Sequence, residues 1–284
     1  MGAVIPNGRL ELALVRWGRV AAVIVLGLTA LAWVGWATGI QQLTRIYPSW
    51  PTMKPWTAVW LAALAVAILV QSGSRSPARK WIGRGLAAMV AVTTATMLAE
   101  YLTGRTFGLD QVWFTEAVRS LQPTLPGRPS PQTVSSAFLL SVAVSLNQVS
   151  RSGTRKVWAV SLVVAMVMPF VTILAYLFGA VAQLRLAAST GMALTTALSL
   201  LLLGAATVLL HPVWPLARSD RSTLIRLGMI LAGFPLLVGL SRRLFLALGL
   251  GQDLALTVET ATGSMVLGAG AYRLSRREHA LREA

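Results

Sequence analysis

Four charged side chains stand within apolar stretches of the sequence, where charge is costly and therefore needs a purpose. They are Glu100, Arg242, Arg243 and Glu259. Counted at about 1.5 Å per helical residue, all four lie near the same end of the helices that carry them. A short turn joins the two apolar stretches that carry the arginines and Glu259, so either arginine can lie beside Glu259. Two interpretations stay open: a structural ion pair with the second arginine reaching the headgroups, or a polar pocket for a small acidic ligand.

Aromatic residues border the same level and extend the candidate ligand-binding set. Trp36, Tyr101 and Tyr176 each end an apolar run and are each followed three positions later by glycine. The next apolar run then opens near a threonine, at Thr57, Thr133 and Thr196. An internal repeat explains the matching order. The matching order is also explained by ordinary features of a helix end at the membrane interface, where aromatic rings lie among the headgroups and glycine ends the helix.

Other chemistry is poorly supported by the sequence. The chain has no cysteine, and its two histidines, His211 and His279, have no partner at metal-ligand spacing. We therefore expect no metal and no cofactor. No catalytic constellation is evident, so this chain is not expected to be an enzyme.

The composition is that of a polytopic membrane protein. Hydrophobic residues make up 55% of the chain and charged residues 12%, and the mean hydropathy is +0.67. The lipid bilayer is therefore the expected environment. The formal net charge of +16 is better explained by basic cytoplasmic loops than by nucleic-acid binding.

Eight apolar runs are long enough to span a bilayer. They are about 20–39, 55–71, 84–104, 132–149, 156–179, 189–210, 226–250 and 254–273. The connections on one side of the membrane carry seventeen Lys and Arg residues, and those on the other side carry six. Because basic residues favour the cytoplasmic side, both termini, which lie on the side with seventeen, are predicted to be cytoplasmic. The expected location is the inner (plasma) membrane of the cell. The predicted fold is thus all-α: eight transmembrane helices built from three to four helix-out, helix-in repeats.

The predicted organisation has three parts. Residues 1–19 form a basic cytoplasmic lead-in, residues 20–273 the membrane domain, and residues 274–284 a cytoplasmic exit helix. The longest outer loop, 105–131, is expected to contain a short helix from Gln111 to Leu121 capped by Asp110. That helix either rests on the membrane or covers the bundle.

The last span continues without a helix breaker into the exit helix. Ser264 and Gly268 make a small-xxx-small pair suited to close helix packing. Leu274 and Leu281 are seven residues apart, which fits the start of a two-stranded coiled coil or a solvated amphipathic tail. These four residues are the candidate signalling helix. They predict a homodimer and a linker to a cytoplasmic output domain.

Three stretches carry a resemblance to a known family. They are the openings Met53 to Thr57 and Pro129 to Thr133, the segment from Glu100 to Gln111, and the run from Pro126 to Pro131. The sequence resembles the eight-span N-terminal membrane sensory module (MASE-like) of bacterial diguanylate cyclases and sensor histidine kinases. The third opening, at Met192, lacks the proline of the other two. The resemblance implies sensing, followed by a diguanylate cyclase or two-component histidine kinase output.

Two function classes follow. The first is a membrane-embedded sensing and dimerisation module, which perceives an exoplasmic or intramembrane stimulus and moves its last helix. The alternative is a small-molecule transporter or channel. Repeats and buried charges favour transport, whereas the absence of a midplane charge and of a clearly broken helix counts against it. A membrane enzyme is the weakest option.

Overall fold

A computed structural model describes most of the first three quarters of the chain. It covers residues 8–72, 76–109, 112–121, 126–147, 152–180 and 191–210, and single positions between 233 and 248. These residues form helices and connecting segments, with no strand among them. Contacts divide the chain into two units, 1–173 with 181–214 and 174–180 with 215–284, which are described separately. The all-α prediction is confirmed for this part of the chain.

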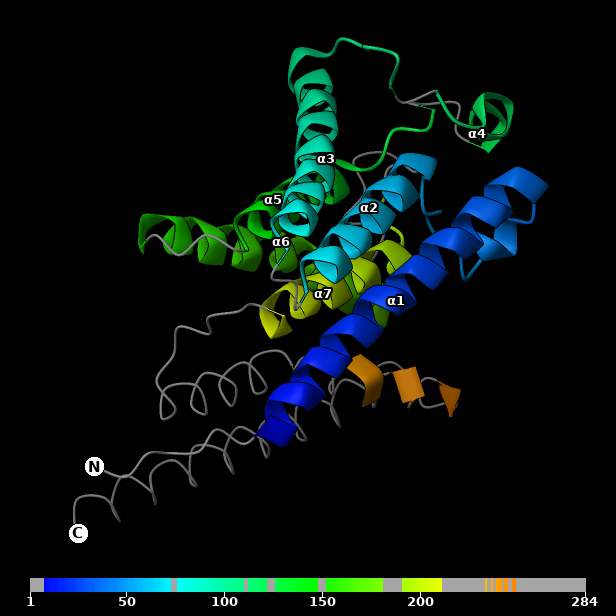
Figure 1. The fold of residues 1–284 in the computed structure, drawn as a ribbon. Coiled ribbons are helices and arrows are strands. Elements are labelled where there is room, and N and C mark those ends of the chain that lie inside the picture. Colours follow the sequence, from blue (N-terminus) through cyan, green and yellow to red (C-terminus); the bar gives the residue numbers. More distant parts are fainter. Residues whose placement is uncertain are drawn as a thin grey trace, which may run out of the picture. The chain divides into compact units, whose positions relative to one another are not determined.

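Six of the eight predicted spans coincide with helices. They are α1 (Gly8–Thr38), α2 (Pro55–Gln71), α3 (Pro77–Thr103), α5 (Pro131–Leu146), α6 (Ser152–Phe178) and α7 (Leu194–Leu209), shown in Figure 1. A single 3-10 turn, η1 (Gln41–Leu43), follows α1, and α4 (Thr115–Leu121) lies in the longest loop. The seventh span is described only at single positions, and the eighth lies outside the described residues.

Three helices begin several residues earlier than predicted: α6 by four residues, and α1 and α3 by more. α1 begins at Gly8 and so includes much of the predicted lead-in, and α3 begins at Pro77 rather than at residue 84. The prediction followed apolarity, which stops at charged residues such as Arg19 and Arg84. Charged side chains do not end a helix, and arginine and lysine are good helix formers. Proline at the first helical position marks the start of α3 instead.

Helix length separates the six helices into two kinds. Three contain a segment long and apolar enough to cross a membrane: Val15–Thr38, Pro77–Thr103 and Gly153–Phe178. The other three, α2, α5 and α7, are apolar but have only 17, 16 and 16 residues. At 1.5 Å per residue they are ~25 Å long, shorter than a hydrocarbon core of about 30 Å. Three helices of membrane-spanning length are therefore established, and the full set of eight spans stays a prediction.

The short helices form the centre of the first unit. α2, α5 and α7 contact one another, and the long helices pack outside them: α1 against α2 and α7, and α3 against α2 and α5. The largest fully buried side chains come mainly from the short helices, with Trp60, Leu64, Leu140 and Leu203 among them. Each repeat thus pairs a long, partly exposed helix with a short, buried one.

Glycine allows the helices to approach closely and shows their directions. A β-carbon at Gly18, early in α1, would lie 2.8 Å from Leu210, which directly follows α7. A β-carbon at Gly83, early in α3, would lie 2.5 Å from Gln71 at the end of α2. Within the first unit, α1 and α3 therefore run toward one end of the bundle, and α2 and α7 run back. We call this end, where α1 and α3 end and α2, α5 and α7 begin, the loop end.

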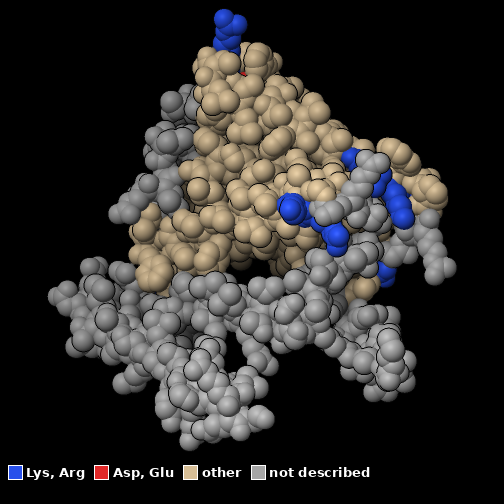
Figure 2. Space-filling model, turned by 90° about the vertical axis from the view of Figure 1, so that its left-hand side faces the viewer, with Lys and Arg blue, Asp and Glu red and all other residues tan. Residues whose placement is uncertain are grey.

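The surface has the charge distribution that a lipid environment requires. Figure 2 shows a broad uncharged area over the described residues, with one basic side chain at the top and a group of basic side chains at the right. Exposed residues of the long helices are largely apolar, for example Val23, Leu31, Val92 and Val163. Hydrocarbon tolerates such a surface, whereas exposed charge there is costly.

The close approach of α2 and α3 predicts opposite effects of the same substitution at two glycines of α3. In Gly83→Ala, the new β-carbon would overlap Gln71 and lie 2.9 Å from the carbonyl oxygen of Ala67. We expect a loss of about 1–3 kcal/mol of stability from overpacking. In Gly85→Ala, no atom lies within 4 Å of the new carbon, and alanine stabilises a helix by up to ~1 kcal/mol. Thermal unfolding in detergent checks both, and equal melting temperatures would contradict the close approach.

Candidate functional site at the loop end

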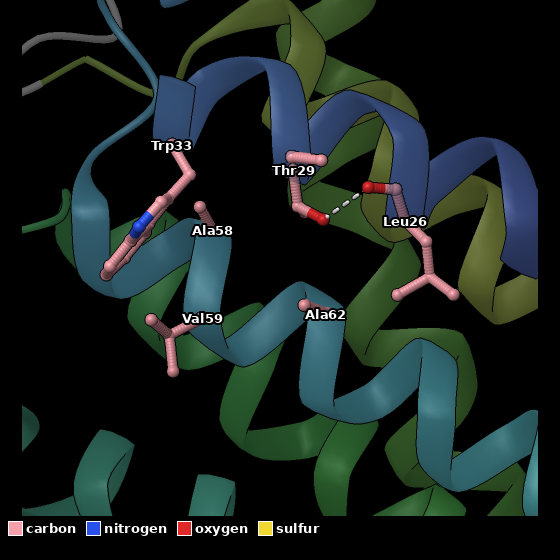
Figure 3. A pocket seen from close by; sticks show the side chains of 7 residues that line it. Leu26, Thr29, Trp33, Ala58, Val59 and Ala62 are labelled. Carbon is pink, nitrogen blue, oxygen red and sulfur yellow. Dashed lines mark hydrogen bonds between the residues drawn. The ribbon is translucent and has the colours of Figure 1, made fainter. Parts of the chain in front are cut away.

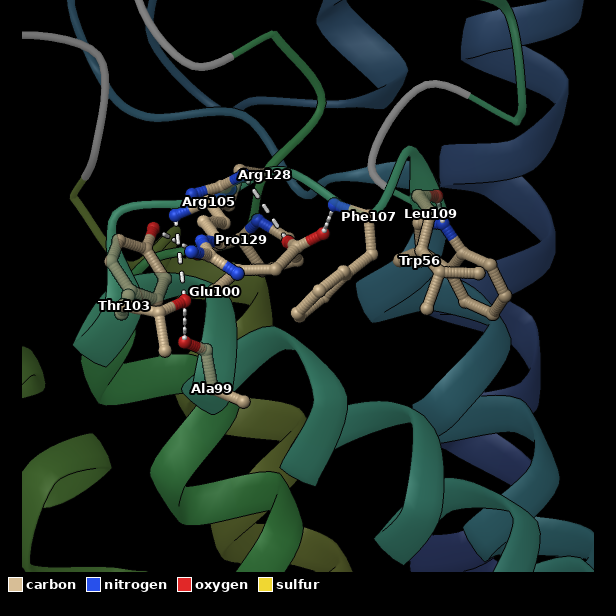
Figure 4. Close-up of polar contacts among 10 residues, drawn as sticks. Trp56, Ala99, Glu100, Thr103, Arg105, Phe107, Leu109, Arg128 and Pro129 are labelled. Atoms are coloured by element: carbon tan, nitrogen blue, oxygen red, sulfur yellow. Dashed lines mark hydrogen bonds and ion pairs between the residues drawn. The ribbon is translucent and has the colours of Figure 1, made fainter.

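Glu100 lies in the last turn of α3 and is paired. Its Oε2 lies 3.2 Å from Nη2 of Arg128, and the two side chains are 0% and 3% exposed. Its Oε1 accepts a hydrogen bond of 2.6 Å from the backbone N–H of Phe107 (Figure 4). A carboxylate held by a guanidinium and a backbone amide in a buried place is a strong interaction. The pair joins the end of α3 to the segment that leads into α5.

Tyr101 reinforces the same connection. Its hydroxyl donates a hydrogen bond of 2.8 Å to the carbonyl of Pro129, and the Arg128 guanidinium carbon lies 5.3 Å from the ring centroid. Gly104 directly follows α3, and its φ of 67° is the left-handed conformation that turns the chain out of a helix. Glu100, Tyr101 and Arg128 therefore form one cluster, which we call the α3–α5 clamp.

Trp36 makes the equivalent contact one repeat earlier. Its Nε1 donates a hydrogen bond of 2.8 Å to the carbonyl of Met53. Met53 stands four residues before Thr57, just as Pro129 stands four residues before Thr133. In two copies, then, an aromatic donor on the outgoing helix binds the carbonyl two residues before the incoming helix. This geometry supports the internal repeat.

The burial of these aromatic residues does not fit interfacial anchoring. Trp36 is 4% exposed and Tyr176 is 2% exposed, and Tyr101 is half-buried. Anchoring rings would lie among lipid headgroups and remain exposed on the protein surface. In the third copy, Tyr176 and Met192 hold the corresponding sequence positions and both are buried. Of the two interpretations of the pattern, burial favours the repeat.

Arg243 satisfies the end of α6, within the second unit. Its Nε donates a hydrogen bond of 2.9 Å to the carbonyl of Leu177, and its Nη2 donates to the carbonyl of Tyr176. These carbonyls belong to the last turn of α6, where no further helical N–H is available. Gly179, with a φ of 73°, ends the helix. A cation here also opposes the negative end of the helix dipole.

The structure thus sorts the predicted site residues into separate roles. Glu100 and Tyr101 share Arg128, Trp36 holds the start of α2, and Arg243 contacts the backbone at Tyr176. Arg242 and Glu259, and with them the predicted ion pair, lie outside the described residues, as do Ser264, Gly268, Leu274 and Leu281. Sequence reasoning missed Arg128. A signal was present, because a buried Glu100 needs a cation and Arg128 belongs to the loop that follows α3.

The loop between α3 and α5 covers the ends of α1 and α2 through aromatic contacts. The ring centroids of Trp113 and Phe114 lie 5.3 Å and 5.1 Å from that of Trp33 on α1, both edge to face. Trp56 of α2 donates through Nε1 to the carbonyl of Leu109 (Figure 4). Val118 of α4 is fully buried. This part of the loop lies on the bundle, as one of the two sequence interpretations proposed.

The helix in this loop is shorter than predicted. It spans Thr115–Leu121 and does not begin at Gln111. Phe114, immediately before it, has a φ of 51°, which is incompatible with a right-handed helix. The predicted cap, Asp110, lies outside the described residues.

Lys54 is a buried cation beside the same helix ends. It directly precedes α2, is 4% exposed, and its ammonium donates a hydrogen bond of 3.1 Å to the hydroxyl of Thr52. Burial lowers the pKa of Lys54 to about 7, and the positive charge of Arg45 acts in the same direction. The described part of the chain brings no carboxylate into an ion pair with it. It also contains no group of three acidic, His or Cys residues that could hold a metal.

Comparison of the chain with family models, with curated proteins and with solved structures finds no match. The class of protein therefore rests on the structure itself. Its described part is an all-helical bundle with three helices of membrane-spanning length. At the loop end, the buried pair of Glu100 and Arg128 joins α3 to the segment before α5, whereas the buried Lys54 is held by Thr52 of its own segment.

Breaking the α3–α5 clamp is expected to destabilise the protein strongly. Arg128→Gln leaves Glu100 without its cation, and Glu100→Gln leaves a buried guanidinium without its anion. Each change is expected to cost about 3–5 kcal/mol of stability. The double variant should lose less than the sum, because neither buried charge then remains. Thermal unfolding in detergent measures the stability of the two single variants and the double variant. Glu116→Gln on the exposed face of α4 is the control. Additive losses would contradict direct pairing.

Lys54 predicts a pH dependence of stability. Its folded pKa of about 7 lies below the unfolded value of about 10.4. Between these values the unfolded chain binds more protons, so the free energy of unfolding rises with pH. Lys54→Met removes the buried charge. We expect this variant to melt above the unsubstituted protein at pH 6.5 and to converge with it toward pH 10.

Lys156→Met, at an exposed position near the start of α6, is the matched control for this comparison. It should melt in parallel with the unsubstituted protein at every pH. If Lys54→Met also runs in parallel, the ammonium is not buried as charge in the folded protein.

Proposed function

We propose that the chain is a membrane-embedded sensing and dimerisation module of a bacterial plasma membrane, with both termini in the cytoplasm. A stimulus at the outer face or within the bilayer shifts the helices, and the last helix transmits the shift to a cytoplasmic output domain of cyclase or kinase type. In this proposal the loop end faces outward, and a homodimer is the signalling unit.

The observation that carries the proposal is the coupling of consecutive helices at the loop end. The α3–α5 clamp ties α3 to the start of α5, and the Trp36–Met53 contact ties α1 to the start of α2. The connecting loop also touches α1 and α2. A displacement of that loop therefore acts on several helix ends together, and helices transmit it as rigid elements.

The described helices offer little that would support a polar transport path. Several of their buried mid-helix hydroxyls donate to carbonyls of their own helix, as in Thr94 to Val90, Ser141 to Phe138 and Thr207 to Leu203. Among these helices, the hydroxyl of Ser199 on α7 is the exception, since it is buried without a hydrogen-bond partner. A hydroxyl bound in this way does not need a substrate or a water chain. This arrangement favours sensing over the alternative of a transporter or channel.

Disulfide crosslinking tests the proposed signalling helix against a clean background, because the chain has no cysteine. Single variants Leu274→Cys and Leu281→Cys are compared in oxidised membranes with His279→Cys, which lies on the opposite face of the expected heptad. We expect covalent dimers at 274 and 281 and few at 279. Adding Tyr101→Phe, which removes the bond to Pro129, should change the crosslinking yield at 274. Arg105→Gln, an exposed change in the same loop, should leave it unaltered.

Equal crosslinking at all three positions, or no effect of Tyr101→Phe, would contradict transmission through the last helix. The same purified protein in vesicles then separates the alternative. Uptake of small anions or amines above that of protein-free vesicles would identify a transporter or channel.

A further inference from the structure

An apolar groove lies between α1 and α2, near the loop end. Its volume is about 370 Å³, within the usual range for small-ligand sites. Figure 3 shows it between the two helices. Its lining is Leu26, Thr29, Ala30, Trp33, Ala58, Val59 and Ala62. The three alanines create the hollow, because larger side chains at these positions would fill it.

The lining of the groove offers no site for an ordered water molecule. The one hydroxyl in its lining, that of Thr29, donates to the carbonyl of Leu26 at 2.9 Å and is thus already engaged. The other lining side chains, Trp33 apart, are hydrocarbon. A water in such a place would lack the two to four polar partners that hold buried water. The natural occupant is therefore apolar along most of its length.

One polar donor stands at the end of the groove. The ring of Trp33 extends from α1 toward Ala58 and Val59 of α2 (Figure 3). Trp36 and Trp56, the neighbouring tryptophans, donate through Nε1 to backbone carbonyls. Among the described residues, no acceptor is bound to Nε1 of Trp33, whose contacts are the aromatic rings of Trp113 and Phe114. The groove thus combines an apolar lining with a single hydrogen-bond donor.

The depth of the groove matches a lipid. Trp33 lies five residues before the end of α1, and Leu26 twelve residues before it, or ~8 Å and ~18 Å along the helix. α1 belongs to the helices of membrane-spanning length, and Leu31 and Val34 beside the groove are exposed and apolar. Trp33 is therefore placed near the boundary of hydrocarbon and headgroups, where tryptophan is enriched and lipid ester carbonyls lie.

We propose that the α1–α2 groove binds one acyl chain of a phospholipid, whose ester carbonyl accepts a hydrogen bond from Nε1 of Trp33. The lining carries no charge, so the headgroup contributes nothing to recognition inside the groove. This inference concerns a binding site and does not depend on the signalling role.

The test uses the full chain in vesicles that contain a phosphatidylcholine with a photoreactive diazirine in one acyl chain. After illumination, labelled peptides are mapped and quantified. We expect α1 around Leu26–Trp33 and α2 around Ala58–Ala62 to be labelled several-fold more than the exposed apolar face of α6. Ala62→Leu should fill the groove and reduce that excess to the level of α6. Ala88→Leu, at an exposed position of α3, is the matched control and should leave it unchanged.

A second arm tests the hydrogen bond. Unlabelled ester-linked and ether-linked phosphatidylcholines of equal chain length compete with the probe. The ester lipid should compete roughly fivefold better, the usual effect of one neutral hydrogen bond. Trp33→Phe keeps an aromatic ring at the groove but removes the donor, and it should abolish the difference between the two lipids.

Two results would overturn the proposal. Labelling that is uniform over all lipid-facing helices and indifferent to Ala62→Leu would show ordinary solvation by lipid. Protection of the groove from the probe, together with loss of dimers in Ala62→Leu, would show that a second copy of the chain covers it.

Discussion

Backbone carbonyls that are buried beside a helix end must find donors within the protein, because an unpaired buried carbonyl is costly. This constraint organises the loop end. There, Trp36, Tyr101 and Trp56 donate to the carbonyls of Met53, Pro129 and Leu109. Within the second unit, Arg243 donates in the same way to the end of α6. Each donor lies far along the sequence from its acceptor. The same hydrogen bonds therefore both pair the backbone carbonyls and join distant segments of the chain.

The buried charges follow the same logic. Glu100 and Arg128 neutralise each other where neither is exposed, and the guanidinium also covers the ring of Tyr101. The pair is best understood as the fixed connection between α3 and α5. Because the carboxylate already has a guanidinium and a backbone amide, an outside acidic ligand would have to displace Arg128 from a closed arrangement. Lys54 differs, since a hydroxyl is its partner and its charge is held at a cost.

The sequence allowed the helices to be predicted far better than their contacts. Proline at the first helical position located α2 and α5 to within one residue, because it marks a helix start chemically. The starts of α1 and α3 were placed too late, since apolarity reports where lipid begins and not where a helix begins. The partner of Glu100 was missed because loop paths leave no periodic trace. The aromatic residues were ambiguous for a related reason: a donor to a distant carbonyl and a headgroup anchor occupy the same sequence position.

In each pair of a long helix and the short helix that follows, the two helices match different hydrocarbon thicknesses of the bilayer. In the first, the apolar segment Val15–Thr38 has 24 residues and α2 has 17, or ~36 Å against ~26 Å. No bilayer matches both. The short helix is shielded by its neighbours, so the mismatch falls on the long one, which tilts more as the bilayer becomes thinner. Because Trp36 fixes the end of α1 to the start of α2, α1 tilts about the loop end. The resulting displacement of the helix is therefore largest at the opposite face of the membrane.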